Sequence, residues 1–278
     1  MFTPNIIALD LDGTLFSRSG EITPYTKQQI RSAVEKGITV VISTGRPYIG
    51  LPIKEANELG IQYAITSNGA GIYRIADKTC LYEEGMDAPL AAELFRHLFK
   101  RHIYIDAFIH GDAYTQISNV DIIRHCAVPE SVKNYILTTR ERVDDLAAYL
   151  LEHNLTLQKA TLNFELETDG VYVDREETKT FLLSRPEIHT VSGGYHNLEF
   201  TKAGVTKAKG LRFLCDYLNI PMEHSMVCGD SENDLDILKA AGLAVAMENA
   251  EESVKAVCDY VTTSCNEDGV GRAIANFI

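Results

Sequence analysis

The feature that most constrains the fold is an alternation of short apolar runs with amphipathic, helix-like stretches in the first third of the chain. Glycines at positions 37 and 60 end the two helical patterns, as expected for helix C-termini. Strands separated by helices at this spacing are typical of a parallel sheet covered on both faces. The predicted order is strand 6–10, helix 24–37, strand 38–42, helix 47–58 and strand 61–65.

The last third of the chain repeats this rhythm. Pro221 and Gly242 separate its predicted elements. The repetition predicts that both ends of the chain contribute to a single α/β domain. The predicted order here is helix 206–218, strand 225–228, helix 233–241 and strand 243–247.

The middle of the chain has a different pattern. Apolar and polar residues alternate over 157–167, which predicts an antiparallel sheet with one solvent-facing side. A length of 278 residues also fits about two domains. We therefore expect a core domain from 1–83 and 191–278, and an inserted α+β domain over 84–190, with hinges at 83–85 and 188–194. The other elements expected in the insertion are helix 89–100, strand 103–108, strand 112–118 and helix 142–153.

Polar side chains follow each predicted strand of the first and last thirds, at the edge where open parallel sheets bind ligands. Turn chemistry would explain any one of these strand ends, but not four ends with matching ligands. Acidic groups gathered at one edge repel each other unless a hard cation neutralises them, and all-oxygen ligands suit Mg²⁺. The residues at the four ends are Asp10, Asp12, Thr44, Gly45, Arg46, Asn68, Asp230, Asn233 and Asp234.

The charge balance excludes some classes of partner. With 26 Lys and Arg against 39 Asp and Glu, the net charge is 26 − 39 = −13. This acidity argues against nucleic-acid binding and against docking on anionic lipid. Six scattered cysteines without zinc-ligand spacing, together with an N-terminus that does not resemble a signal peptide, indicate the cytoplasm. We expect a monomer or weak homodimer.

Four motifs in this order resemble those of the haloacid dehalogenase superfamily of phosphatases. They are Asp10-Leu-Asp-Gly-Thr-Leu15, Thr44-Gly-Arg46, Lys207 and Gly229-Asp-Ser-Glu-Asn-Asp234. More narrowly, the chain is similar to the Cof-type branch, in which a large α/β cap of type IIB is inserted after the third core strand. The resemblance implies a Rossmann-like, doubly wound core. Ala208 and Glu248 stand where this branch usually has glycine.

The resemblance also implies roles for the motif residues. Asp10 would be the nucleophile that accepts the phosphoryl group, and Asp12 the acid and base. Thr44 and the N–H of Gly45, near a helix N-terminus, would bind phosphate oxygens, and Lys207 would neutralise the nucleophile and the phosphoryl group.

The implied cofactor is Mg²⁺. Its ligands would be Asp10, the backbone carbonyl of Asp12, Asp230 and Asp234, the last of these directly or through a neighbouring ligand. Four further residues would line the site. For Arg46, pairing with a carboxylate is an equal alternative. For Asn68 and Asn249 at the rim, a purely structural role in a turn is an equal alternative. These four are Arg46, Asn68, Asn233 and Asn249.

The expected activity is Mg²⁺-dependent hydrolysis of a small phosphorylated metabolite, a sugar phosphate or a nucleotide-like phosphate. A phosphotransferase or sugar phosphomutase on the same core is the alternative enzyme, and it needs a basic insertion that holds two phosphates. The cluster Arg96, Lys100 and Arg101 reads instead as an exposed helix end. A non-catalytic ligand binder is the third hypothesis, and the intact set of motif residues argues against it.

Overall fold

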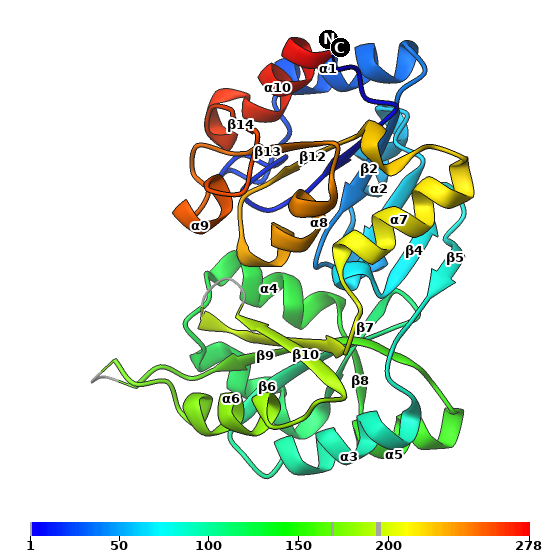
Figure 1. The fold of residues 1–278 in the computed structure, drawn as a ribbon. Coiled ribbons are helices and arrows are strands. Elements are labelled where there is room, and N and C mark those ends of the chain that lie inside the picture. Colours follow the sequence, from blue (N-terminus) through cyan, green and yellow to red (C-terminus); the bar gives the residue numbers. More distant parts are fainter. Residues whose placement is uncertain (1, 168–169, 193–195) are drawn as a thin grey trace. The chain divides into compact units, whose positions relative to one another are not determined.

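The chain folds into two compact units, drawn as a ribbon in Figure 1. The computed structural model describes residues 2–167, 170–192 and 196–278. The first unit comprises Met1–Tyr82 and Thr206–Ile278, and the second comprises Glu83–Val205. The second junction therefore lies at Val205, later than the residue 190 expected from the sequence, because Ile188–Ser192 pair with Leu198–Lys202 within the second unit.

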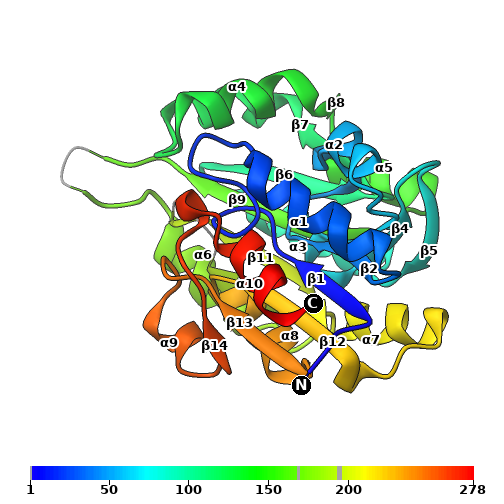
Figure 2. The ribbon, with the colours of Figure 1, turned by 90° about the horizontal axis from the view of Figure 1, so that it is seen from above.

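The first unit is built on an eight-stranded sheet in the order β14-β13-β12-β1-β2-β3-β4-β5. Its central pairs are parallel: Leu9 of β1 is in register with Cys228 of β12 and with Ile42 of β2. The position of β1 between these two strands can be followed in Figure 2. The strands are β1 (Ile6–Leu9), β2 (Thr39–Ser43), β3 (Tyr63–Thr66), β4 (Gly71–Arg74), β5 (Thr79–Glu83), β12 (Ser225–Gly229), β13 (Leu243–Ala246) and β14 (Tyr260–Val261).

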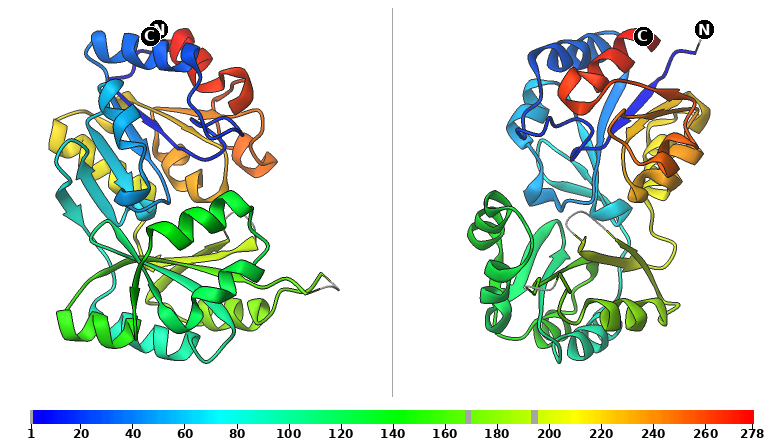
Figure 3. Two further views of the ribbon diagram at one scale, coloured as in Figure 1. Left: turned by 180° about the vertical axis from the view of Figure 1, so that it is seen from behind. Right: turned by 90° about the vertical axis from the view of Figure 1, so that its left-hand side faces the viewer.

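Helices cover both faces of this sheet, which confirms the doubly wound fold expected from the sequence. α1 and α10 pack together on one face, and α7 and α8 lie on the other (Figure 3). The residues of β1 are buried throughout, as expected for a strand between two helical layers. The helices are α1 (Pro24–Glu35), α2 (Ile53–Glu58), α7 (Lys207–Leu218), α8 (Leu235–Ala240), α9 (Glu252–Lys255) and α10 (Gly269–Phe277), with 3₁₀ turns at Tyr48–Gly50, Ser67–Gly69, Met222–His224, Glu232–Asp234 and Cys265–Glu267.

The helix predicted over 47–58 is wrong in its first half. The chain instead forms a 3₁₀ turn at Tyr48–Gly50 and begins α2 only at Ile53. Pro52 explains the break, because a proline disfavours the helical conformation of the residue before it, and Leu51 is extended.

The second unit contains a six-stranded sheet in the order β10-β11-β9-β6-β7-β8. Its long central pair, β6 and β9, is antiparallel. Most of its pairs are antiparallel, but β7 and β8 are parallel. The elements are α3 (Ala88–Leu98), β6 (Ile103–Ile109), β7 (Asp112–Gln116), α4 (Glu130–Thr139), β8 (Glu141–Val143), α5 (Leu146–His153), β9 (Leu157–Phe164), α6 (Arg175–Leu183), β10 (Ile188–Ser192) and β11 (Leu198–Lys202), with a 3₁₀ segment at Ile117–His125.

The expectation of one solvent-facing side is wrong for β9, whose residues are all buried. One face packs against α3 and α5. On the other, Tyr104 clusters with Ile123 of the 3₁₀ segment and Ile136 of α4, and Figure 1 shows α4 opposite α3 and α5. The polar residues of β9 therefore face a second layer of chain, not water.

Two smaller expectations for the second unit also differ from the structure. The helix predicted over 142–153 begins only at Leu146, because Glu141–Val143 form β8 beside β7. The hinge expected at 188–194 is wrong over Ile188–Ser192, which form β10 and pair residue by residue with β11. Residues 193 and 194 lie outside the described residues.

Candidate active site

The site begins at the ends of β1, β2 and β12, where three neighbouring parallel strands stop at one edge of the first unit's sheet. The backbone N–H of Asp10 donates to the carbonyl of Cys228 at 3.1 Å, which extends the β1–β12 pairing by one residue. Asp230 follows β12 directly, and Thr44 follows β2. The register of the sheet thus brings together segments more than 200 residues apart in sequence.

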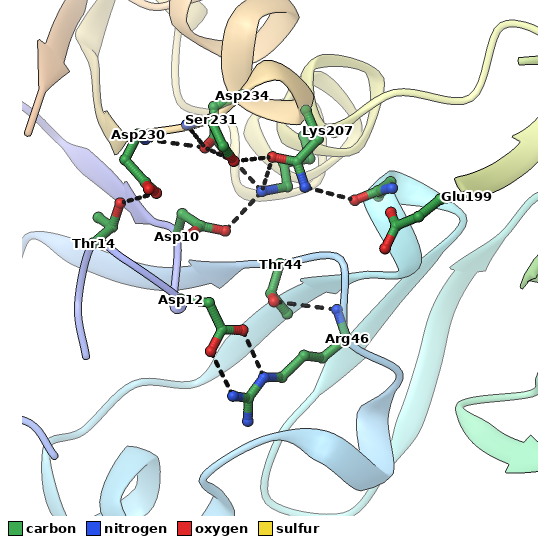
Figure 4. A network of polar contacts seen from close by, with 12 residues as sticks. Asp10, Asp12, Thr14, Thr44, Arg46, Glu199, Lys207, Asp230, Ser231 and Asp234 are labelled. Atoms are coloured by element: carbon green, nitrogen blue, oxygen red, sulfur yellow. Dashed lines mark hydrogen bonds and ion pairs between the residues drawn. The ribbon is translucent and has the colours of Figure 1, made fainter. Parts of the chain in front are cut away.

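Lys207 is the centre of the cluster. Its Nζ lies 2.7 Å from Oδ1 of Asp10 and 2.7 Å from Oδ1 of Asp234. Figure 4 shows both carboxylates pointing toward this ammonium group. The Lys207 side chain is 0 % exposed, so the two ion pairs lie in a low-dielectric environment. The side chain of Thr206 caps the start of α7 by accepting from the N–H of Lys209, and so the helix start survives the alanine at 208.

The second oxygen of Asp234 is bound to the backbone. Its Oδ2 accepts from the N–H groups of Asp230 and Ser231, each at 3.2 Å, and this fixes the turn after β12. Asp230 is held in turn by Thr14, whose hydroxyl donates to Oδ1 of Asp230 at 2.9 Å. Sequence reasoning assigned no role to Thr14 or Ser231, although both lie inside the quoted motifs.

Two glycines allow these loops to approach each other. Gly13 has φ +85°, and a Cβ at this position would lie 2.3 Å from Oδ2 of Asp230. A Cβ at Gly229 would lie 2.7 Å from the Cβ of Asp234. Any larger residue would therefore push the two acidic loops apart.

The charges of this cluster do not balance. Asp10, Asp230 and Asp234 offer oxygen atoms within 4.8 Å of one another. When all three carboxylates are ionised, the single positive charge of Lys207 leaves a net charge of −3 + 1 = −2. Burial, and then the neighbouring carboxylates, raise the pKa of Asp10 despite Lys207, and burial followed by Asp234 raises the pKa of Asp230 to about 7. An oxygen-rich site with two excess negative charges fits a divalent hard cation.

This imbalance predicts that the metal-free protein becomes less stable as the pH rises. The folded-state pKa of Asp230 is raised above its unfolded value, so the folded chain binds the extra proton at pH 5 and loses that advantage as the pH rises through about 7. In EDTA, we expect the free energy of unfolding to fall by on the order of 2 kcal/mol between about pH 5 and pH 8. Denaturant titrations at a series of pH values measure this free energy of unfolding.

Saturating Mg²⁺ should remove most of this pH dependence, because a bound cation replaces the protons. An Asp230→Asn variant is the matched control and should show a shallower slope in EDTA. A flat profile for the metal-free wild type would contradict the charge imbalance.

Asp12 lies apart from the buried cluster and pairs with Arg46. The guanidinium group binds both carboxylate oxygens, with Nε 2.8 Å from Oδ2 and Nη2 2.6 Å from Oδ1. Arg46 is fixed in turn by the carbonyl of Gly50 at 3.1 Å and by the ring of Phe16, whose centroid is 5.4 Å away. Of the two roles considered for Arg46, the structure thus shows pairing with a carboxylate.

Replacing Arg46 should reduce turnover while leaving stability almost unchanged. Both side chains of the pair are substantially exposed, at 36 % and 60 %, so an Arg46→Gln change should alter the free energy of unfolding by less than about 1 kcal/mol. Loss of the bidentate contact would leave Asp12 poorly positioned for the acid and base role that the family resemblance implies, and we therefore expect kcat to fall by about tenfold. Steady-state kinetics measure the expected loss of kcat, and denaturant unfolding measures the expected small change in the free energy of unfolding.

Arg74 provides a matched control, because it makes a similar bidentate pair with Asp77 on the surface. Arg74→Gln should leave kcat unchanged. Equal kinetic effects of the two substitutions would contradict a positioning role for Arg46.

The remaining predicted residues lie at the end of β2 and beside Lys207. Thr44 is buried, and its hydroxyl accepts the N–H of Arg46 at 3.2 Å. Gly45 follows it, but the α-helix expected just beyond Gly45 is replaced by the 3₁₀ turn. Asn233 is within 3.5 Å of Lys207 Nζ and donates to Oδ1 of Asn68 at 3.3 Å, and so these two asparagines join the cluster.

Asn249 is occupied by backbone contacts. Its Nδ2 donates to the carbonyl of Gly13 at 2.8 Å, and its Oδ1 accepts from the N–H of Cys265 at 2.9 Å. The side chain therefore ties the loop after β1 to the segment after β14. Its geometry favours the structural alternative over a contact on the rim.

Comparisons with known proteins identify the family of the chain. The model of the haloacid dehalogenase-like hydrolase family matches residues 7–274. A relative from Bacillus subtilis, 5-amino-6-(5-phospho-D-ribitylamino)uracil phosphatase YcsE, is 27 % identical over 98 % of this chain and 95 % of its own length. Within the described residues, no helix is long and apolar enough to cross a membrane.

Two solved structures share the fold over nearly their whole length. A haloacid dehalogenase-like hydrolase from B. subtilis has a TM-score of 0.82 and 27 % identity, covering 99 % of this chain and 100 % of that one. A sugar phosphatase of haloacid dehalogenase subclass IIB has a TM-score of 0.78 and 25 % identity, covering 98 % of each chain. The chain therefore belongs to the haloacid dehalogenase-like hydrolases and is a phosphatase of their Cof-type branch.

Proposed function

We propose that this chain hydrolyses a small phosphorylated metabolite through a phosphoryl group carried on Asp10. The observation that supports this most directly is the buried Asp10 carboxylate, which shares Lys207 with Asp234 and lies beside Asp230. A carboxylate is a weak nucleophile, so positioning and charge neutralisation must supply most of the catalysis. Lys207 provides both for Asp10.

The proposed reaction has two steps, and both use the Asp-x-Asp pair. A carboxylate oxygen of Asp10 attacks phosphorus, the bond to the leaving oxygen breaks, and Asp12 gives that oxygen a proton. Asp12, now ionised, takes a proton from the water that attacks the phosphorus of the aspartyl-phosphate, which releases phosphate and restores Asp10. Because Arg46 occupies both oxygens of Asp12, one of these contacts must open for each proton transfer.

Mg²⁺ is the proposed cofactor. Asp10, Asp230 and Asp234 have the oxygen ligands and the excess of negative charge that such a cation requires, and the backbone carbonyl of Asp12 is proposed to complete the set. When bound, the cation would supply charge stabilisation for the transferring phosphoryl group. The hydroxyl of Thr44 and the N–H of Gly45 are proposed to bind the phosphate oxygens.

The proposed substrates are phosphorylated sugars, sugar alcohols or nucleotide-like compounds of similar size. The names of two of the proteins compared support this class, since one refers to a phosphoribityl-aminouracil and the other to a sugar phosphatase. The second unit, Glu83–Val205, is proposed to be the type IIB cap that sets substrate specificity. All six cysteines are free thiols, which supports a cytoplasmic setting.

A phosphometabolite panel with Mg²⁺, and again with EDTA, tests this function. We expect release of inorganic phosphate from sugar or ribityl phosphates, and its loss in EDTA. The panel should be repeated with excess sugar as an acceptor. Transfer of the phosphoryl group to the sugar in place of water would overturn hydrolysis in favour of a phosphotransferase, and absence of turnover across the panel would overturn both.

A further inference from the structure

A pocket of about 300 Å³ lies between α3 and α6, within the second unit. Its volume is at the lower end of the range for small-molecule sites. Both helices, labelled in Figure 1, belong to this unit, so the pocket is complete within it. The lining residues are Glu93, Arg96, His97, Lys100, Phe181 and Arg185.

The pocket is basic although the protein as a whole is acidic. Arg185 is engaged by Glu93, 2.8 Å from its Nη1, and by Glu187. Arg96, Lys100 and Arg101 have no acidic partner among the described residues. The four cations and the two glutamates give a local charge of +4 − 2 = +2, on a chain whose net charge is −13.

The ring of Phe181 lies among these basic side chains. The imidazole of His97 stacks on its ring, with centroids 3.7 Å apart. The guanidinium carbons of Arg101 and Arg185 lie 5.9 and 6.0 Å from the centroid of the same ring. The ring thus contacts His97 and lies near the guanidinium groups of Arg101 and Arg185, of which Arg185 also lines the pocket.

Three nitrogen atoms here are buried without a hydrogen bond in the described part of the chain. They are Nε2 of His97, Nε of Arg101 and Nε of Arg185, the last of which lies 3.4 Å from Glu187. Buried polar atoms in native proteins nearly always find a partner, which can be a water or an ion. Burial, and then the charges of Arg101, Lys100 and Arg185, lower the pKa of His97, which is consistent with a strongly positive local potential.

Compensation of the α3 dipole explains only part of this arrangement. Cations near a helix C-terminus are stabilising, and Arg96 and His97 lie in the last turn of α3. The dipole does not explain why α6 contributes Phe181, or why Arg185 from beyond α6 also lines the pocket. The gathering of basic side chains from two separate segments around one open pocket points to a ligand.

We propose that this pocket binds a phosphate-bearing small anion, with Arg96 and Lys100 as its main ligands. A guanidinium group matches the oxygens of a phosphate in pairs, and a lysine ammonium adds a compact point charge. A phosphate monoester carries about −1.5 to −2 charges at neutral pH, which balances the local +2. Nothing in this proposal depends on the catalytic role of Asp10. Anion binding at this pocket and the proposed phosphatase mechanism can therefore be disproved independently of each other.

Calorimetric titration of the full chain with inorganic phosphate tests the proposal, with phenyl phosphate and acetate as further probes. Working in EDTA prevents hydrolysis and leaves the acidic cluster of the first unit with its excess of negative charge. We expect the wild type to bind both phosphates more tightly than acetate. An Arg96→Gln/Lys100→Gln double variant should bind phosphate at least about tenfold more weakly, since it loses two charge-assisted contacts.

Lys27 and Arg31 provide a matched control, because they have the same spacing on α1 and the same charge. Lys27→Gln/Arg31→Gln should leave phosphate affinity unchanged. Equal weakening by both double variants would show general electrostatic attraction and overturn the site, as would wild-type phosphate binding that survives in Arg96→Gln/Lys100→Gln. Retained phosphatase activity in that variant confirms that it folds.

Discussion

An Asp10→Asn variant is expected to lose at least about a thousandfold in kcat, while its fold remains intact. The amide cannot attack phosphorus as a carboxylate does, and so the first chemical step is lost. The amide oxygen can still accept the hydrogen bond that Lys207 donates at 2.7 Å. Hydrolysis of p-nitrophenyl phosphate with saturating Mg²⁺ measures the loss directly.

The stability of the same variant provides a second readout. Burial raises the pKa of Asp10 well above its usual value in the metal-free cluster, so a neutral side chain is tolerated there. In EDTA at pH 8, the free energy of unfolding should be within about 1 kcal/mol of the wild type or higher. Asp236→Asn, an exposed change on α8, is the control and should leave activity unchanged. Full activity in Asp10→Asn would refute the assigned nucleophile.

A Lys207→Met variant is expected to lose both activity and stability. Methionine fills the buried space but removes the only cation paired with Asp10 and Asp234 among the described residues. Breaking a buried ion pair by removing one partner destabilises a protein by about 3–5 kcal/mol. The orphaned carboxylates would also repel the phosphoryl group, so we expect kcat to fall by at least about a hundredfold.

The pH dependence of this variant separates electrostatics from packing. Without the ammonium group, the carboxylates must be protonated to remain buried, so part of the lost stability should return as the pH falls toward about 5. Lys209→Met, two residues along α7 at an exposed position, is the control. A Lys207→Met protein as stable as the control at pH 8 would contradict the account of the cluster.

Much of the candidate site could be predicted because its residues follow strands directly. Asp10, Thr44 and Asp230 each come just after a buried apolar run, and the parallel register places such residues at one edge. The sequence could not show how their side chains share contacts. That Lys207 binds two carboxylates, and that Arg46 binds both oxygens of Asp12, depends on distances between segments remote in sequence.

The second unit was predicted less well, for a physical reason. Alternating polar residues such as Asn163 on β9 predict a wet face, but that face is covered by Ile117–His125 and α4, whose own hydrophobic patterns are weak. Likewise β10 pairs with β11, and β11 pairs with β9, and neither pairing can be predicted from a local sequence pattern. Long-range pairing therefore placed the second junction of the units later than expected.

Trapping the phosphoryl group on Asp10 tests the central claim most directly. An Asp12→Asn variant with p-nitrophenyl phosphate suits the experiment, because this leaving group needs no acid while release of the phosphoryl group from Asp10 still needs a base. After acid quenching, borohydride reduction of an aspartyl-phosphate and peptide mass spectrometry should find homoserine at position 10. Phosphate release by the wild type, with aspartate unchanged at position 10 in both proteins, would contradict the account.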